Sequence, residues 1–139
     1  MSTDETLLDR LRIRERFGAY SDATFRRDGD AWLACWTEDG VRVQGGAEHR
    51  GKAELRRMWD GVWTSLDKLA FFTEIGPIEV MGDRATARSH CREILFLKGG
   101  GRRKVVGLYE DQLVRQGGVW LFARREYSLF MDEGTERSA

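Results

Sequence analysis

Apolar side chains recur every three or four residues along the first part of the chain. The stripe consists of Ile13, Phe17, Tyr20 and Thr24. This spacing places them on one face and predicts a long helix over residues 4–27. Ser2 and Glu5 have the spacing of a capping box, in which the serine side chain satisfies a free backbone amide at a helix start.

Two shorter helices are predicted next. The first carries the apolar cluster Trp32, Leu33, Cys35 and Trp36 and stops before the polar sequence 38–40. Residues 41–44 alternate as a short strand, and a loop bracketed by glycines follows. The second helix is expected from about residue 52 to residue 65, because Leu55, Trp59 and Val62 share one helical face.

Beyond residue 68 the apolar period changes to two, which predicts strands over residues 69–80, 85–97, 105–114 and 119–130. Glycines mark each turn, and Gly76-Pro77 predicts a bend or bulge in the first strand. The tail 132–139 is polar and expected to fray. Four strands in an antiparallel meander need their apolar face covered, and the helices are what can cover it. The pattern therefore predicts an α+β fold with a curved sheet in the shape of a cone.

Composition narrows the class of protein. The 139 residues suffice for one domain, with an ordered core expected over about 4–131. Basic and acidic residues number 23 each, which argues against a general nucleic-acid or membrane-surface partner. The acidic N-terminus is no signal peptide and no membrane-spanning run exists, so a cytoplasmic location is expected. Two cysteines and two histidines argue against a disulfide framework and against a metal site, and no cofactor is expected.

Seven segments carry a resemblance to a known family. They are AY (19–20), RRDGDAW (26–32), CWTEDG (35–40), GK (51–52), VMGDRATA (80–87), GLYED (107–111) and GVWLFARR (118–125). In this order and spacing the chain resembles the SnoaL-like branch of the nuclear transport factor 2-like superfamily over about residues 8–127. The resemblance implies a curved antiparallel sheet wrapped around helices into a cone-shaped barrel with a central pocket. It also implies a cofactor-free lyase, isomerase or cyclase acting on a small hydrophobic, cyclic or polyketide-like molecule.

The family's dehydratases use an Asp near the end of the first helix and a His on the first long strand. The resemblance places Phe25 at the first position, and Phe71, Phe72 or Thr73 at the second. Phenylalanine cannot transfer a proton, so the dehydratase mechanism does not carry over. If Phe25 and Phe71 occupy these positions, the deep pocket is apolar. The nearby acids Asp22 and Asp28 are better explained by a solvated surface and a turn.

Four residues remain as catalytic candidates: His90, Tyr109, Asp111 and Arg125. An imidazole can act as acid or base near pH 7, but strand alternation turns His90 outward unless a bulge near residues 92–93 reverses it. Tyr109 could serve as a donor and Asp111 as a base inside an apolar cone. Alternatively Asp111 and Arg125 form an ion pair that joins two strands. The resemblance gives the Arg125 position the role of receiving an anionic leaving group.

Aromatic residues form the expected ligand surface. The predicted substrate-binding residues are Tyr20, Phe25, Trp36, Trp59, Trp63, Phe71, Thr73 and Tyr127. Several of them must belong to the core, but a cone with an open mouth cannot bury them all. The remainder would suit a flat apolar molecule.

Two alternatives to the enzyme stay open. Loss of the Asp/His dyad favours a non-catalytic ligand-binding or assembly protein, and a ring-hydroxylating dioxygenase small subunit is the other alternative. Whatever the function, the resemblance implies a homodimer formed through the outer face of the sheet. Val106, Leu108 and Val114 have the parity opposite to Tyr109, and such an apolar row is poorly tolerated in water.

Overall fold

The computed structural model describes residues 2–135 and contains three helices on one curved sheet. Helix α1 (Thr3–Phe25) begins where the side chain of Ser2 accepts a hydrogen bond from the amide of Glu5 at 3.1 Å, so the predicted cap is confirmed. It ends at Phe25 with Arg26 as its C-cap, and Arg27 then adopts a positive φ of 56°. This turn leads to Asp28, whose carboxylate caps α2 (Gly29–Leu33) at Ala31.

The short helices and strands differ in detail from the expected elements. Helix α2 stops before Cys35, and Trp36 instead opens strand β1 (Trp36–Gln44). The expected glycine-bracketed loop contains a strand, β2 (Ala47–Arg50), which pairs with β1 as a hairpin. Helix α3 (Lys52–Val62) follows at once and ends three residues earlier than expected.

The second half is the predicted antiparallel meander. Its strands are β3 (Leu66–Met81), β4 (Arg84–Leu97), β5 (Arg102–Gln116) and β6 (Val119–Thr135). The register of β3 shifts between Ile75 and Ile78, which confirms the bend at Gly76-Pro77. Strand β6 continues to Thr135, so the expected fraying from residue 132 is wrong for residues 132–135. The rest of that tail, residues 136–139, lies outside the described residues.

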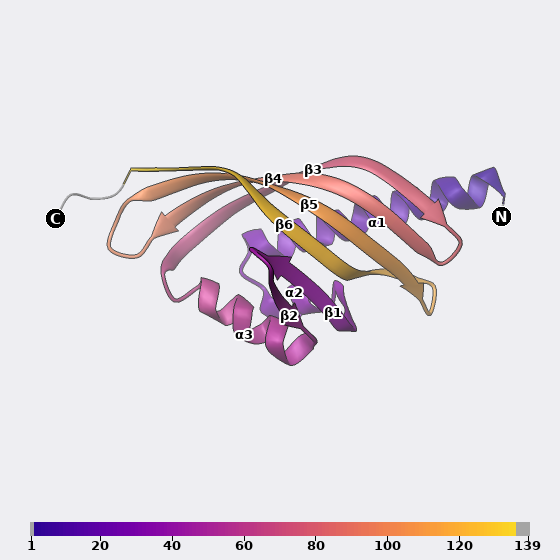
Figure 1. The fold of residues 1–139 in the computed structure, drawn as a ribbon, viewed down its shortest axis with the longest axis horizontal. Coiled ribbons are helices and arrows are strands. Elements are labelled where there is room, and N and C mark those ends of the chain that lie inside the picture. The colour runs from indigo at the N-terminus through magenta and orange to yellow at the C-terminus, as the bar shows by residue number, and fades with distance from the viewer. Residues whose placement is uncertain (1, 136–139) are drawn as a thin grey trace.

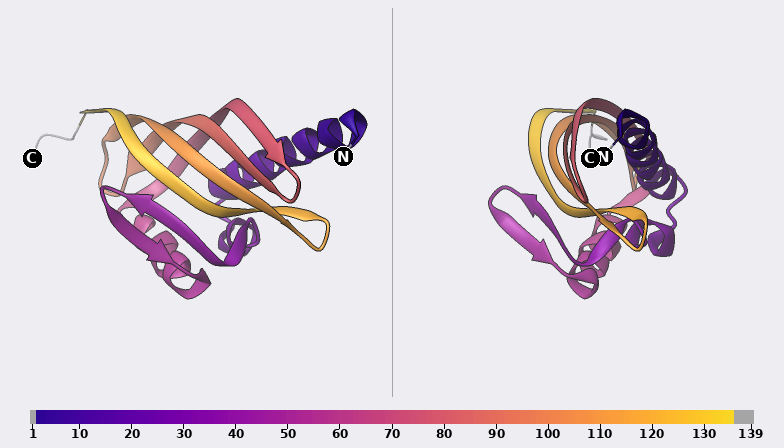
Figure 2. Two further views of the ribbon diagram at one scale, coloured as in Figure 1. Left: turned by 45° about the vertical axis from the view of Figure 1, so that its right-hand side comes forward. Right: turned by 90° about the vertical axis from the view of Figure 1, so that its right-hand side faces the viewer.

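All six strands form one sheet in the order β2-β1-β6-β5-β4-β3. The β1–β6 pair is parallel and all other pairs are antiparallel. The long strands curve, and α1 lies across the open side of the curve, while α2, α3 and the β1–β2 hairpin lie together at one side (Figures 1 and 2). The sheet is not closed into a barrel. The predicted α+β class with a curved sheet is confirmed, but the strands do not close into the expected barrel, and helices complete the wall that the strands leave open (Figure 2).

The core lies between α1 and the inner face of the sheet. From α1 it takes the predicted stripe, since Ile13, Phe17 and Tyr20 are all buried. One end is held by Asp9, a buried carboxylate that accepts hydrogen bonds from the guanidinium of Arg115 and the indole of Trp120, each at 3.0 Å. A buried carboxylate is tolerated because these charged and polar donors satisfy it.

Candidate functional site

An aromatic cavity of about 140 Å³ lies between the three helices and the inner face of the sheet. Its apolar lining comes from Tyr20, Trp32, Met58, Trp59, Val62, Trp63, Leu69 and Phe71. Trp32 and Trp59 stack with their ring centres 4.8 Å apart, and Trp63 meets Trp59 edge-on at 5.5 Å. Flat, polarisable walls of this kind favour a flat apolar ligand.

Polar groups reach the same cavity from five elements. They are Thr24, Arg42, Gln44, His49, Glu93 and Tyr109. Polar side chains gather around β1 because of the strand register, in which Arg42 pairs with His49 on β2 and with Arg125 on β6. The Arg42 guanidinium donates to the Gln44 side chain at 2.6 Å and to the Tyr109 hydroxyl at 3.3 Å. It also lies over the Tyr127 ring, 5.3 Å from its centre.

Glu93 is the carboxyl group of this cavity. It lies on β4, between Phe71 of β3 and Val105 of β5 in the register. Among residues 2–135 no side chain or backbone group hydrogen bonds to its carboxylate. Burial raises the pKa of Glu93, and the charge of Arg42 offsets part of that shift. A carboxyl group of this kind can hold or release a proton nearer to neutral pH than an exposed glutamate.

Tyr109 supplies a hydroxyl group at the same cavity and is almost fully buried. Burial raises its pKa well above the ordinary value, with partial compensation from Arg42, so the phenol remains protonated at neutral pH. Because Arg42 donates to the phenol oxygen, the Tyr109 proton is directed elsewhere. Tyr109 can therefore donate a hydrogen bond to a ligand oxygen.

Arg125 lies deeper, behind Tyr20 and Tyr109, and is fully closed off from solvent. Its Nε donates to Asp111 at 2.7 Å, and Nη2 donates to Ser89 at 3.1 Å. Ser89 in turn donates to Asp111 at 2.9 Å. Burial disfavours the guanidinium charge, but Asp111 and the neighbouring phenols hold the pKa of Arg125 above its ordinary value. The strand-joining ion pair, the alternative left open by the sequence, is the arrangement observed.

Comparison with known proteins assigns the family. A model described as the SnoaL-like domain matches residues 5–126. The chain belongs to the SnoaL-like family. A solved protein of unknown function from Mycobacterium tuberculosis is 30% identical to it, with a TM-score of 0.84 over 94% of this chain and 76% of the other. The nuclear transport factor 2-like fold expected from the seven segments is thereby confirmed.

Two further solved structures share the fold at lower identity. A protein from Novosphingobium aromaticivorans, described as a candidate scytalone dehydratase, is 21% identical with a TM-score of 0.89, over 99% of this chain and 95% of the other. The hexachlorocyclohexane dehydrochlorinase LinA-type3 from Novosphingobium barchaimii LL02 is 16% identical with a TM-score of 0.86, over 96% and 94%. A search of curated proteins found no match.

Five of the twelve residues predicted for this SnoaL-like site line the cavity: Tyr20, Trp59, Trp63, Phe71 and Tyr109. His90 is not among them. The β4 register runs without a shift past residues 92–93, so the postulated bulge is absent and His90 lies exposed on the outer face. Asp111 and Arg125 do not line the cavity either, because they form a buried ion pair with each other.

Four aromatic or hydroxyl residues predicted to bind substrate lie elsewhere. Phe25 is 51% exposed and packs edge-on against Phe72, so it does not line a deep pocket. Trp36 is fully buried in the core, because it begins β1 rather than ending a helix. Thr73 hydrogen bonds to Ser21 at 2.7 Å, which ties β3 to α1. Tyr127 packs on Tyr109 with ring centres 5.1 Å apart and supports that residue from behind.

Sequence reasoning missed Arg42 and Glu93, and with them the polar half of the cavity. The expectation of an apolar deep pocket is therefore wrong. Glu93 could have been found from parity alone, since Ala87, Ser89 and Cys91 form an inward row that reaches Glu93 next. Arg42 carried no such signal, because alternation in β1 puts it on the face opposite the buried Val41 and Val43, and the sequence does not reveal what that face meets.

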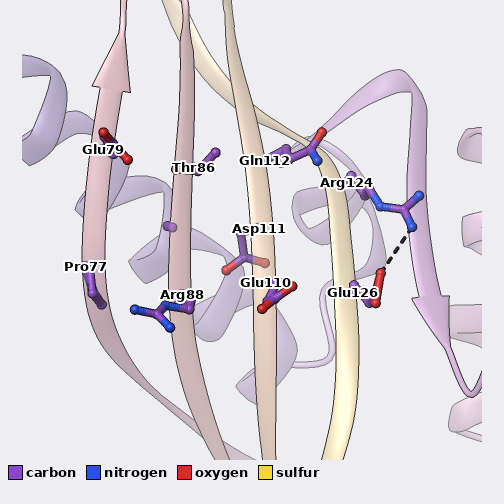
Figure 3. A pocket seen from close by; sticks show the side chains of 10 residues that line it. Pro77, Glu79, Thr86, Arg88, Glu110, Asp111, Gln112, Arg124 and Glu126 are labelled. Atoms are coloured by element: carbon purple, nitrogen blue, oxygen red, sulfur yellow. Dashed lines mark hydrogen bonds and ion pairs between the residues drawn. The ribbon is translucent and has the colours of Figure 1, made fainter.

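A second hollow, of about 340 Å³, lies on the outer face of the sheet. Figure 3 shows charged side chains from four strands around it, among them Glu79, Arg88, Glu110 and Glu126, with Arg124 paired to Glu126. No tryptophan, tyrosine or phenylalanine borders it. We therefore assign the ligand site to the aromatic cavity.

Within residues 2–135 no group of three or more His, Cys, Asp or Glu side chains is arranged to hold a metal ion. In the same part of the chain, no helix combines the length and the apolar character that crossing a membrane would need.

Proposed function

We propose that this SnoaL-like protein is a cofactor-free acid–base catalyst of the lyase or isomerase type that acts on a small, flat, hydrophobic cyclic molecule. The observation that carries the proposal is the position of Glu93. Its carboxyl group lines an aromatic cavity without a hydrogen-bond partner among the described residues, and its pKa is raised by burial. Perturbed acids in apolar cavities are typical of proton-transfer sites.

The chemistry assigned to the pocket is proton abstraction beside a carbonyl group. Ionised Glu93 accepts the proton from carbon, and the electron pair left on carbon moves toward the carbonyl oxygen. Tyr109 donates a hydrogen bond to that oxygen as negative charge develops there. Return of the proton to another carbon gives an isomerisation, whereas departure of a group from the adjacent carbon gives an elimination. Two neighbours of the same fold carry names that describe eliminations, which supports the second outcome.

Cavity size limits the substrate. A closed apolar cavity of about 150 Å³ accommodates benzene, and the volume found here is close to that, about 140 Å³. One six-membered ring can pack against the tryptophans, and larger substituents would have to extend out of the cavity. The proposal is therefore a monocyclic reacting group rather than a large fused-ring system inside the pocket.

Deuterium exchange tests this function without knowledge of the natural substrate. Small cyclic ketones such as cyclohexanone and cyclohexenone are incubated with the protein in D2O, and the α-proton signals are followed by NMR. We expect faster exchange than in buffer and a loss of about 10²-fold or more in Glu93→Gln. Glu74→Gln, which changes an exposed glutamate on β3, is the matched control and should exchange like the unmodified protein. Exchange at the buffer rate with all these ketones would contradict the catalytic proposal.

A non-catalytic ligand-binding protein is the second candidate. It is favoured by Phe71, which lines the cavity at a position where the resemblance expects the dehydratase histidine. Binding of these ketones with no acceleration of exchange would support this candidate over the enzyme.

A further inference from the structure

The inner face of the sheet carries two arginines side by side. Arg42 on β1 and Arg125 on β6 are paired in the parallel register. Asp111 stands next in the same row, opposite Arg125 on β5, and neutralises it at 2.7 Å. Arg42 has no such counter-ion. Among residues 2–135 no carboxylate oxygen lies within 4.0 Å of its guanidinium, and its hydrogen-bond partners are the neutral side chains of Gln44, Met58 and Tyr109.

An arginine without a counter-ion is costly to enclose in an aromatic pocket. Desolvation removes the hydration of the guanidinium, and neutral partners restore only part of it. Arg42 is only partly exposed, lies over the rings of Tyr109 and Tyr127, and lines the cavity itself. A guanidinium in these surroundings is suited to a planar anion that can take two hydrogen bonds at once.

We propose that the ligand of the aromatic cavity is a cyclic acid, with its ring packed against the tryptophans and its carboxylate or other planar oxyanion on Arg42. This inference rests on the proposed function only for the location of the pocket, since anion binding does not require catalysis. Tyr109 is placed to donate a hydrogen bond to the same oxygens, because Arg42 already occupies its acceptor side.

Glu93 makes the binding of an acid depend on pH. Besides Arg42, the titratable groups that line the cavity are Tyr20 from α1, His49 from β2 and Tyr109 from β5. Outside the lining, Cys91 of β4 and Tyr127 of β6 also interact electrostatically with Glu93. The lining side chains of α2, α3 and β3 are all uncharged: Trp32, Met58, Trp59, Val62, Trp63, Leu69 and Phe71. Glu93 in its protonated form leaves the charge of Arg42 free for the ligand. Once ionised, Glu93 repels the incoming anion and competes for Arg42, so affinity for an acid falls as pH rises.

Calorimetric titration with benzoate and benzamide tests this proposal. The two probes have nearly the same shape and differ in charge. We expect the unmodified protein to bind benzoate at least 10-fold more tightly than benzamide at about pH 5, where benzoate is still largely ionised. Arg42→Gln should bring benzoate down to the benzamide affinity and leave benzamide unchanged. Arg42→Lys should keep part of the preference, and Arg14→Gln, an exposed arginine of α1, should keep all of it.

The pH dependence supplies a second readout. Between about pH 5 and pH 8 the benzoate preference of the unmodified protein should decline, and in Glu93→Gln it should stay constant. Equal affinities for the two probes in the unmodified protein, or a preference that survives Arg42→Gln in a variant with an unchanged melting temperature, would overturn the inference while leaving the catalytic pocket in place. Failure of both probes to bind would overturn the pocket assignment and the proposed function together.

Discussion

The Nε atom of Arg125 donates a hydrogen bond to Oδ1 of Asp111 across 2.7 Å, and neither side chain reaches solvent. The pair joins β6 to β5 inside a ring of aromatic side chains, with the guanidinium carbon 3.7 Å from the centre of the Tyr109 ring. A buried charge of this kind depends on its partner, because water cannot replace the partner once it is removed.

Loss of Asp111 should therefore destabilise the folded protein strongly. Asp111→Asn leaves Arg125 charged and without a counter-ion, and we expect the free energy of unfolding to fall by about 3–5 kcal/mol in chemical denaturation. Replacing both residues, as in Asp111→Leu with Arg125→Met, should cost less than the single change. A double variant that is less stable than Asp111→Asn would contradict this account of the pair.

Glu93→Gln should stabilise the protein at high pH. The folded protein raises the pKa of Glu93, so the unfolded chain, with a glutamate pKa of about 4.3, releases this proton first as pH rises. The folded state then bears a growing cost that begins near that pH and is complete above the folded-state pKa. At about pH 4 the variant and the unmodified protein should have equal melting temperatures. At about pH 8 the variant should melt a few degrees higher. Equal melting temperatures at both would contradict the raised pKa.

Gly107 is expected to tolerate no side chain. A Cβ atom built there would lie 2.2 Å from the Tyr127 ring, which crosses β5 at this glycine. Gly107→Ala should cost about 1–3 kcal/mol because the ring must move. It should also disturb Tyr109, against which Tyr127 packs. When Tyr127→Ala is already present, Gly107→Ala should lower the free energy of unfolding much less than it does in the unmodified protein. In a double-mutant cycle, strictly additive effects would show that the ring is not what excludes a side chain.

The outer face of the sheet is where we expect a second copy of the chain to pack. Leu108 is 37% exposed there, and Val106 and Val114 lie partly exposed on the same face of β5. Leu108→Glu should weaken a dimer held by this face, since a carboxylate would have to be buried beside Glu110 and Glu126. Sedimentation should show a dimer for the unmodified protein and monomer for the variant at tens of micromolar. A monomer in both would contradict the dimer.

Sequence patterns located the elements well where a local signal exists. The cap at Ser2, the α1 stripe and the strand turns at Gly82 and Gly117-Gly118 all depend on residues close in the chain. The β1–β6 pairing joins residues about 80 apart and has no such local signal. The end of α2 was missed because an apolar run such as Trp32 to Trp36 does not distinguish a short helix from the start of a buried strand.

The site was harder to predict because it depends on which face each strand turns inward. Phe25 illustrates the difficulty. The resemblance places it at the pocket position of the dehydratase Asp, yet α1 ends there and leaves the ring at the sheet edge, half exposed against Phe72. Phe25→Asp should therefore change stability by about 1 kcal/mol or less, and equally at pH 5 and pH 8, since an exposed aspartate is ionised at both.

Half of the cavity lining is supplied by a single stretch of chain. Arg42, Gln44, His49, Met58, Trp59, Val62 and Trp63 all lie within 22 consecutive residues, on the β1–β2 hairpin, α3 and the C-cap of α3. Most of the long-strand framework, with its buried Arg125–Asp111 pair, lies outside that stretch. The side chains proposed to set ligand preference thus lie largely in one continuous segment of the chain. Exchange of residues 42–63 between SnoaL-like proteins would therefore change the side chains proposed to bind the ligand, while the proposed catalytic groups Glu93 and Tyr109 stay in place on β4 and β5.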